Sequence, residues 1–552
     1  MIKIYSIFSL LFLAVTSGIQ AQTYNYYFGN IHAHSSYSDG NKDSSTSNMS
    51  TPLEDFNYAN ASQQIDFYGI SEHNHLSAGM ASPLNFHQGI ADAAAATVNG
   101  SFIALYGMEW GVISGGGHVI VYGYDSLIGW DANDYDVFVA KNNYTGLWTK
   151  INERPSSFAY LAHPQTTDYN NLFTNGVNLL ADNAIIGMAA RSGPAFSTNN
   201  TYSDPDAGSY ISRYNDALKQ GYHLGIGLDH DTHNSVFGRQ CAGRLVVLAP
   251  ALTKADLLEA FHKMRFYSSD DWNTKVDFTI SAKPMGSILT QAGNPTINVT
   301  ITDPDLSETV SSIKVYSGIP GSGAISTILN SNSGSSNLTY THSLTNNATY
   351  YYYLKITQAD GDIIWTSPIW YTRNDAVTNA APIANFTPSA DTVCVGQQMT
   401  FTDNSTNAPA DWSWSLPDAL PATSSNQSVI ASFTTPGVHT VSLTVSNAFG
   451  ASAPVSKTIN AQVCTAIEEA SKSLINVFPN PADACLTVEV KDLQGSKTIE
   501  IYDVSGRLML SEQSSDTVFN VDLASFENGS YFIYIKMNNE IYTTQQFIVN
   551  KK

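Results

Sequence analysis

The sequence predicts a multidomain protein in which an α/β domain is followed by three all-β domains. With 552 residues, the chain is too long for one ordinary domain. All of its 13 histidines except His342 and His439 lie before residue 275, and the helical patterns lie there too. After about Trp272 the chain reads as short strands separated by Gly, Asn and Ser turns, which is typical of β-sandwiches.

The composition limits the partners that the chain can bind. It carries 26 Lys and Arg residues against 47 Asp and Glu residues, so its formal net charge is −21. We therefore expect no patch that binds nucleic acid or anionic lipid, because both need clustered cations. Hydrophobic residues make up 43% of the chain, which is enough to build sizeable cores and argues against disorder.

Residues 1–21 have the layout of a cleaved secretory signal. Lys3 precedes an apolar run over Ile7–Val15, and small residues lead up to Ala21. This run is too short to span a bilayer comfortably, and no other segment approaches transmembrane length. We therefore expect a secreted protein without a transmembrane segment.

The four cysteines are Cys241, Cys394, Cys464 and Cys485, and four cysteines allow three full pairings. Cys394 and Cys464 lie at opposite ends of one expected β-domain, which makes them the favoured pair. None of the four belongs to a CxxC motif or adjoins a catalytic-looking histidine. A thiol nucleophile is therefore not expected.

Helices and strands alternate in the first half of the chain. Apolar residues at three- and four-residue spacing predict helices over 53–64, 210–220 and 254–263. Short apolar runs between them predict strands. This alternation indicates an α/β barrel or a layered sheet. The expected strands cover 67–70, 102–106, 119–122, 158–162, 184–188 and 224–228.

Five short segments of this half carry most of the chemically informative side chains. Their motifs are His32-Ala33-His34 with Ser38-Asp39-Gly40, Ser71-Glu72-His73-Asn74-His75, Met108-Glu109-Trp110 with His118, Leu161-Ala162-His163-Pro164, and Asp229-His230-Asp231-Thr232-His233. Each segment lies in or directly after a short apolar strand, and the strand ends of an α/β domain are where catalytic groups converge. Imidazoles combined with carboxylates suit Zn, Mn or Fe, and a bridging carboxylate suits a site with several metals.

In this order the motifs resemble the polymerase-and-histidinol-phosphatase (PHP) superfamily, and within it the secreted metallohydrolases of the CehA/McbA type. The resemblance covers about residues 24–272. It implies a distorted (β/α)7 barrel that binds two or three divalent metal ions. The metal ligands it implies are His32, His34, Asp39, His73, Glu109, His118, His163, Asp231 and His233, with Glu109 as the bridging carboxylate.

Two positions depart from the family pattern or leave it open. The family usually has Asp where this chain has Glu72, beside the ligand His73. The last motif offers carboxylates in two registers. Asp231 is preferred because only Asp231 and His233 spell DxH, and Asp229 remains the substitute.

The resemblance implies a secreted phosphoesterase that hydrolyses its substrate with a metal-activated hydroxide. Glu109 and Asp39 would lie at the catalytic centre of an enzyme that acts on a small-molecule or polymer substrate. Arg191 follows the expected strand 184–188 and could grip a phosphate of that substrate, but an ordinary surface or structural arginine is the favoured interpretation. The acid that protonates the leaving group stays unassigned between His75 and His230. Two alternatives remain open: the same fold acting on an amide or ester, and a surface protein that binds or adheres without catalysis.

Three β-domains are expected after the α/β domain, at 275–375, 383–462 and 473–552. The second, with Trp412-Ser413-Trp414 at its centre, resembles a PKD domain and is interpreted as a spacer rather than a binding module. The third resembles the C-terminal sorting domain of the type IX secretion system of Gram-negative bacteria. That resemblance implies the type IX machinery as a partner and export across the outer membrane; the alternative is one more adhesive module.

Overall fold

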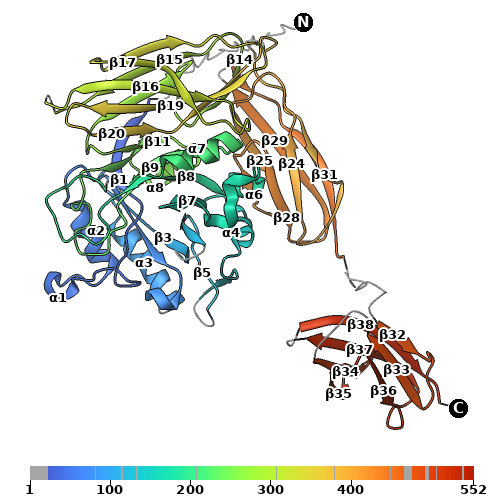
Figure 1. Cartoon of the computed structure of the whole chain (residues 1–552). Coiled ribbons are helices and arrows are strands. Elements are labelled where there is room, and N and C mark those ends of the chain that lie inside the picture. Colours follow the sequence, from blue (N-terminus) through green and yellow to red (C-terminus); the bar gives the residue numbers. More distant parts are fainter. Residues whose placement is uncertain are drawn as a thin grey trace, which may run out of the picture. The chain divides into compact units, whose positions relative to one another are not determined.

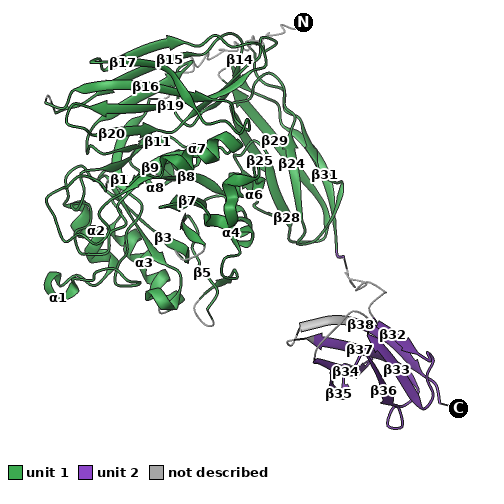
Figure 2. Ribbon diagram, viewed as in Figure 1, with its two compact units in different colours: residues 1–462 green, residues 463–552 purple. Residues whose placement is uncertain are grey.

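The computed structural model describes residues 23–551 apart from 81, 113–115, 132–134, 207, 306, 378–379, 448, 465–474, 491–495, 505 and 538–539. The expected signal over residues 1–21 therefore lies outside the described residues. The chain divides into two compact units, residues 1–462 and residues 463–552 (Figure 2). No helix among the described residues is both long enough and apolar enough to cross a membrane.

The first domain is built on a mixed sheet with helices packed against it (Figure 1). Its strands are buried along almost their whole length, as in β2, because helices and the next domain cover both faces. In spatial order the strands are β11 (Phe266–Ser269), β10 (Arg244–Ala249), β1 (Asn25–Asn30), β2 (Phe67–His73), β3 (Ile103–Val112), β4 (Gly117–Tyr122), β7 (Phe158–Ala162), β8 (Ile185–Ser192) and β9 (Gly225–Asp229).

The strands of this sheet run in mixed directions. Strands β1, β2 and β3 run parallel, and so do β7, β8 and β9. Strand β4, however, is antiparallel to both β3 and β7, and β10 is antiparallel to β1 and β11. The sheet therefore contains both parallel and antiparallel pairs, and these pairings alone do not show the distorted (β/α)7 barrel that the resemblance implies. The first and last strands of this order, β11 and β9, are connected by the Ser367 hydroxyl. It accepts a hydrogen bond from the Ile226 amide of β9 and donates one to the Phe266 carbonyl of β11.

The three helices predicted from periodicity are confirmed as α2, α7 and α8. Local signals explain where helices begin. The Thr51 side chain accepts from the Glu54 amide at the start of α2, and Pro83 is the first residue of α3. The helices of the first domain are α1 (Ser44–Ser47), α2 (Pro52–Asn60), α3 (Pro83–Ala96), α4 (Tyr144–Asn152), α5 (Asp168–Asn171), α6 (Leu179–Ala184), α7 (Ile211–Gln220) and α8 (Lys254–His262), with the two-residue strands β5 (Ile128–Gly129) and β6 (Val137–Phe138) between α3 and α4.

The second domain is the expected β-sandwich, but it is not separated from the first. Strand β20 pairs with β11, so one sheet of the sandwich continues the sheet of the first domain. Phe28 and Tyr267 of the first domain pack in the same core as Phe278 and Leu354 of the second. One sheet holds β12 (Lys275–Ile280), β13 (Lys283–Pro284), β15 (Thr296–Thr302) and β18 (Asn337–Thr341); the other holds β14 (Ile288–Gln291), β16 (Val310–Gly318), β17 (Thr327–Ser333), β19 (Thr349–Gln358), β20 (Ile363–Thr366) and β21 (Ile369–Arg373).

The third domain is also a sandwich, closed around the buried Trp414. Cys394 and Cys464 are both disulfide-bonded, whereas Cys241 and Cys485 are free, so the favoured pairing is confirmed. One sheet contains β22 (Phe386–Pro388), β24 (Gln398–Asp403), β26 (Ala419–Leu420) and β28 (Val429–Phe433). The other contains β23 (Thr392–Cys394), β25 (Asp411–Ser415), β27 (Thr423–Ser424), β29 (Gly437–Asn447), β30 (Gly450–Ala451) and β31 (Val455–Gln462).

The second unit, residues 463–552, is a separate sandwich with its own core, in which Leu486, Val488 and Ile533 are fully buried. Alternation of buried and exposed residues along its strands produces the two faces. Its sheets contain β32 (Ile475–Phe478), β33 (Cys485–Val490) and β36 (Val518–Asp522), and β34 (Lys497–Asp503), β35 (Leu508–Ser514), β37 (Gly529–Met537) and β38 (Glu540–Val549).

Candidate metal centre

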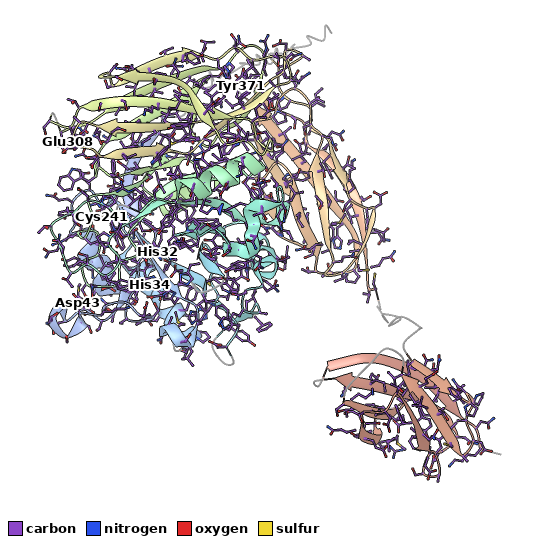
Figure 3. The ribbon with its side chains drawn as sticks, viewed as in Figure 1. His32, His34, Asp43, Cys241, Glu308 and Tyr371 are labelled. Carbon is purple, nitrogen blue, oxygen red and sulfur yellow. The ribbon has the colours of Figure 1, made fainter. Side chains whose placement is uncertain are left out.

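The predicted site residues converge at one edge of the sheet of the first domain. Strand register explains part of this: His73 lies opposite Glu109 on β2 and β3, and His118 lies opposite Gly111 on β4. Because β4 runs against β3, its first residues reach the edge where β2 ends. The remaining site residues lie in the loops that follow β1, β7 and β9; Figure 3 labels His32 and His34 of this group.

Glu109 is the hub of the cluster. Its side chain is 1% exposed, and both of its carboxylate oxygens face imidazoles. Such an arrangement suits a carboxylate shared between two or more cations. Oε1 lies 3.2 Å from His32 Nε2, 2.8 Å from His118 Nδ1 and 3.2 Å from His163 Nε2, and Oε2 lies 3.3 Å from His34 Nε2 and 3.1 Å from His73 Nδ1.

Asp231 provides a second shared carboxylate. Its Oδ1 lies 3.2 Å from His32 Nε2 and 3.3 Å from His34 Nε2. The backbone of Asp231 has a φ of 51°, and that of His163 has a φ of 30°. Non-glycine residues rarely adopt this left-handed region, and strain of this kind gathers at functional sites.

Asp39 forms the third and more open part of the cluster. Its Oδ1 lies 3.5 Å from His73 Nε2, 3.5 Å from His233 Nε2 and 3.9 Å from His34 Nδ1. The Asp39 side chain is 32% exposed, so this part of the site faces solvent. His34 and His73 each turn one ring nitrogen toward Asp39 and the other toward Glu109, which joins the three parts into one centre.

The ligand atoms fit divalent cations. Sets of three or four imidazole nitrogens and carboxylate oxygens lie within 4.8 Å of one another. Several of these buried atoms have no hydrogen-bond partner, and burial of unpartnered polar groups is costly unless something binds them. The unpartnered atoms are His32 Nε2, His34 Nδ1 and Nε2, Asp39 Oδ1, His73 Nδ1, Glu109 Oε2 and His118 Nδ1.

The electrostatics hold Glu109 and His73 in the protonation states that bind cations, whereas, against the effect of burial, the neighbouring carboxylates raise the pKa values of His32, His34 and His163. Burial alone would raise the pKa of Glu109, but the imidazoles around it, His118 first among them, hold this pKa well below its ordinary value. Burial lowers the pKa of His73 to about 3, although Glu109 acts in the opposite direction. Glu109 is therefore ionised and His73 neutral at neutral pH, and these are the forms that act as ligands.

Asp229 lies behind the cluster rather than in it. Its Oδ2 is 3.1 Å from His32 Nδ1, on the side of the ring that faces away from Glu109. A carboxylate in this position fixes the tautomer and the orientation of a ligand imidazole. Asp231 and Asp229 thus take different places, the first facing the ligand group and the second supporting His32.

We expect Asp229→Asn to weaken metal binding about 10- to 100-fold without removing a ligand, because the amide does not fix the His32 tautomer as the carboxylate does. Metal titration monitored by calorimetry measures the change. Asp182→Asn is a matched control, because Asp182 Oδ2 is also 3.1 Å from a histidine Nδ1, that of His223, outside the cluster. Equal effects of the two changes would contradict the assignment.

Glu72, the departure from the family pattern, supports the loop that carries His34 and Asp39. Its carboxylate accepts hydrogen bonds from the Ser35 amide and hydroxyl, and from the Ser38 hydroxyl. The Tyr106 hydroxyl donates to it as well, at 3.3 Å. The glutamate side chain is therefore long enough to contact Ser35, Ser38 and Tyr106. Through the two serines it stabilises the loop that carries the ligands His34 and Asp39.

Arg191, which could grip a phosphate, has protein partners of the kind that a structural arginine would have. Its guanidinium forms an ion pair with Asp270, and its Nε donates to the Asp206 carbonyl at 3.0 Å. The sequence shows an arginine after a strand, but not the partner 79 residues further along that engages it.

Lys42 is a cation at the centre that the sequence did not single out. Its Nζ lies 3.1 Å from Asp39 Oδ2 and 4.6 Å from the ring centroid of Phe196, and its side chain is 42% exposed. The only sequence signal for Lys42 is its position three residues after Asp39.

The two histidines considered as leaving-group acids lie in different surroundings. His230 is fully buried, its Nε2 donates to the Gly243 carbonyl at 2.8 Å, and burial lowers its pKa to about 3. His75 stacks on Trp130, with ring centroids 5.4 Å apart, and lies 5.9 Å from His73. It also lines a pocket of about 410 Å³, together with Trp130 and Lys141. Of the two, only His75 lies at an accessible edge of the centre.

Comparison with known families identifies the last two domains. Residues 379–463 match the model of the PKD domain, and residues 476–550 match that of the secretion system C-terminal sorting domain. Both matches agree with the boundaries expected from the sequence. No curated protein matches the chain.

Three solved structures are distantly similar to parts of the chain. Fibronectin(III)-like modules of Clostridium thermocellum CbhA are 15% identical and cover 34% of this chain and 95% of their own, with a TM-score of 0.16. The PKD1 domain of Vibrio anguillarum Epp is 24% identical and covers 16% and 100%, with a TM-score of 0.14. Latent PorU from Porphyromonas gingivalis is 14% identical and covers 50% and 34%, with a TM-score of 0.15.

The sorting domain settles where the protein acts. A secretion system C-terminal sorting domain directs type IX export, so the machinery of that system is a partner. The chain is a multidomain type IX cargo, exported to the cell surface or the extracellular space, and it carries a PKD domain ahead of its sorting domain.

Proposed function

We propose that residues 24–272 form a metal-dependent hydrolase of the PHP type that cleaves a phosphoester outside the cell. The observation that carries this proposal is the convergence of nine imidazole and carboxylate side chains, Glu109 among them, with buried ligand atoms that have no hydrogen-bond partner. The mixed sheet, which bends until Ser367 bridges β9 and β11, is then a distorted form of the family's barrel.

The residues divide into groups with different tasks. Glu109 and Asp231 supply shared carboxylates, and Asp39 with His233 supplies ligands on the solvent side. Divalent cations held there supply Lewis acidity and bring the pKa of water near neutrality. Asp229 and Glu72 orient the ligand side chains from behind.

The open side of the centre has features that suit a phosphoester. Lys42 places an ammonium group beside Asp39, where it can pair with a phosphoryl oxygen. His75 lies in the pocket beside the centre with a lowered pKa, caused first by burial. It is therefore neutral at neutral pH, and in this form it can accept a proton from an attacking water but does not supply one to a leaving group. Trp130 offers an aromatic face to the rest of the substrate.

The test is turnover of a substrate panel by the full-length chain after loading with Mn²⁺ or Zn²⁺. We expect hydrolysis of a phosphomonoester or phosphodiester that stops on chelation and returns when metal is restored. Hydrolysis confined to amides or carboxylic esters would instead support the same centre acting on a different bond. Metal binding without turnover of any of these would support a binding protein and contradict the proposal.

A further inference from the structure

A second cluster of carboxylates lies where the first domain meets the sandwich. Asp271 comes from the loop between β11 and β12, and Asp303 and Glu308 come from the loop between β15 and β16. Each offers a carboxylate oxygen within 4.8 Å of the others. We call these three residues the junction cluster; Figure 3 labels Glu308.

The carboxylates of the junction cluster have hydrogen-bond donors but no ion-pair partner among the described residues: the Asn273 and Thr274 amides donate to Asp271, and the Thr274 hydroxyl donates to Asp303. Within the described part of the chain, no Lys, Arg or His forms an ion pair with Asp271, Asp303 or Glu308. Burial, followed by the neighbouring Asp271, raises the pKa of Glu308 to about 8. Like charges this close destabilise one another unless a proton or a cation is shared between them.

Two buried amide side chains lie beside the junction cluster, and the oxygen of each has no hydrogen-bond partner. Gln358 is 2% exposed, its Nε2 donates to Asp303 Oδ2 at 2.6 Å, and its Oε1 is buried without a hydrogen-bond partner. Asn273 is 7% exposed, its Nδ2 donates to Asp305 Oδ2 at 2.9 Å, and its Oδ1 likewise has no partner. Buried amide oxygens without partners are unusual, and next to carboxylates they could serve as further ligands for a cation.

We propose that the junction cluster binds a calcium ion that fastens the first domain to the sandwich. All of its donors are oxygens, which suits a hard cation rather than Zn²⁺. Oxygens up to 4.8 Å apart fit around one ion at Ca²⁺–oxygen distances of about 2.3–2.6 Å. Mg²⁺ fits less well, because it requires closer, strictly octahedral ligands and keeps several waters. The site is separate from the histidine centre, so it does not depend on the proposed hydrolase activity.

Terbium luminescence tests this directly, because Tb³⁺ replaces Ca²⁺ and is excited through a nearby indole. Trp272 Nε1 donates to Asp305 Oδ2 at 3.2 Å, so the indole lies next to the cluster. The full-length chain, with its histidine centre already loaded with Zn²⁺, is titrated with Tb³⁺. We expect sensitised emission that Ca²⁺ removes and equal Mg²⁺ does not, and a melting temperature that rises with Ca²⁺.

Glu308→Gln is the decisive variant. It should weaken Ca²⁺ binding at least about tenfold, because charge count sets the affinity of such sites. In chelator, by contrast, it should melt no lower than wild type, because it relieves repulsion within the cluster. Asp360→Asn is the matched control: Asp360 is an exposed carboxylate of the β19–β20 turn, and its removal should leave both responses intact. Ca²⁺-sensitive emission that Glu308→Gln leaves unchanged, or a wild-type chain that does not respond to Ca²⁺, would overturn the proposal.

Discussion

Replacing Glu109 with Gln is expected to reduce hydrolysis on the order of 1,000-fold or more and to remove about one metal ion per chain. The amide has nearly the same shape, but it carries no charge and its nitrogen cannot act as a ligand. Five imidazole nitrogens lie within 3.3 Å of the Glu109 carboxylate, so no other single residue serves as many parts of the centre. Steady-state kinetics and elemental analysis of the same preparation measure the two effects.

The matched control is Glu153→Gln, which neutralises a glutamate paired with Lys150 at the end of α4. It should change neither metal content nor activity. A Glu109→Gln chain that keeps its full metal content and turns over substrate like wild type would contradict the bridging role of Glu109.

Replacing Arg244 with Met is expected to lower the free energy of unfolding of the first domain by about 3–5 kcal/mol. The guanidinium is fully buried and donates to five backbone carbonyls, those of Gln63, Gln64, Gly238, Cys241 and Gly243. Methionine fills much of the space but leaves these carbonyls buried without a donor. The loop over 236–243 that follows His233 should therefore open first.

Urea unfolding monitored by hydrogen exchange follows this domain separately from the others. The control is Arg507→Met in the sorting domain, where the side chain is 71% exposed and its pair with Asp503 is solvated. An Arg244→Met chain with protection equal to wild type in residues 61–66 and 236–243 would show that water replaces the lost donors.

Much of the candidate centre could be predicted because its ligands belong to short local motifs. His32 and His34, and Asp231 and His233, are each two residues apart, and such pairs report a shared environment without knowledge of the fold. Buried strands were equally readable as apolar runs. Their direction was not, because a strand covered on both faces has the same composition whether it runs parallel or antiparallel to its neighbours. The strand over 119–122 was therefore expected, but its antiparallel direction could not be predicted.

The features that the sequence did not reveal depend on contacts between distant residues. Arg191 was considered as a group that could grip a phosphate, and its ion pair with Asp270, which lies directly after β11, could not be read from the sequence. The junction cluster unites Asp271 with Asp303 and Glu308, which no local pattern connects. The sheet shared by the first two domains was missed because the pairing of β11 with β20 joins residues about one hundred positions apart in the chain.

The central claim is that the histidine cluster holds metal, and metal content per chain tests it most directly. The full-length wild type and a His32→Ala/His34→Ala double variant are purified side by side, reconstituted with Mn²⁺ or Zn²⁺, and analysed for bound metal. We expect about two to three ions per wild-type chain and a clear reduction in the variant. A wild-type chain that stays free of transition metal after reconstitution, or a variant that binds as much as wild type, would contradict it.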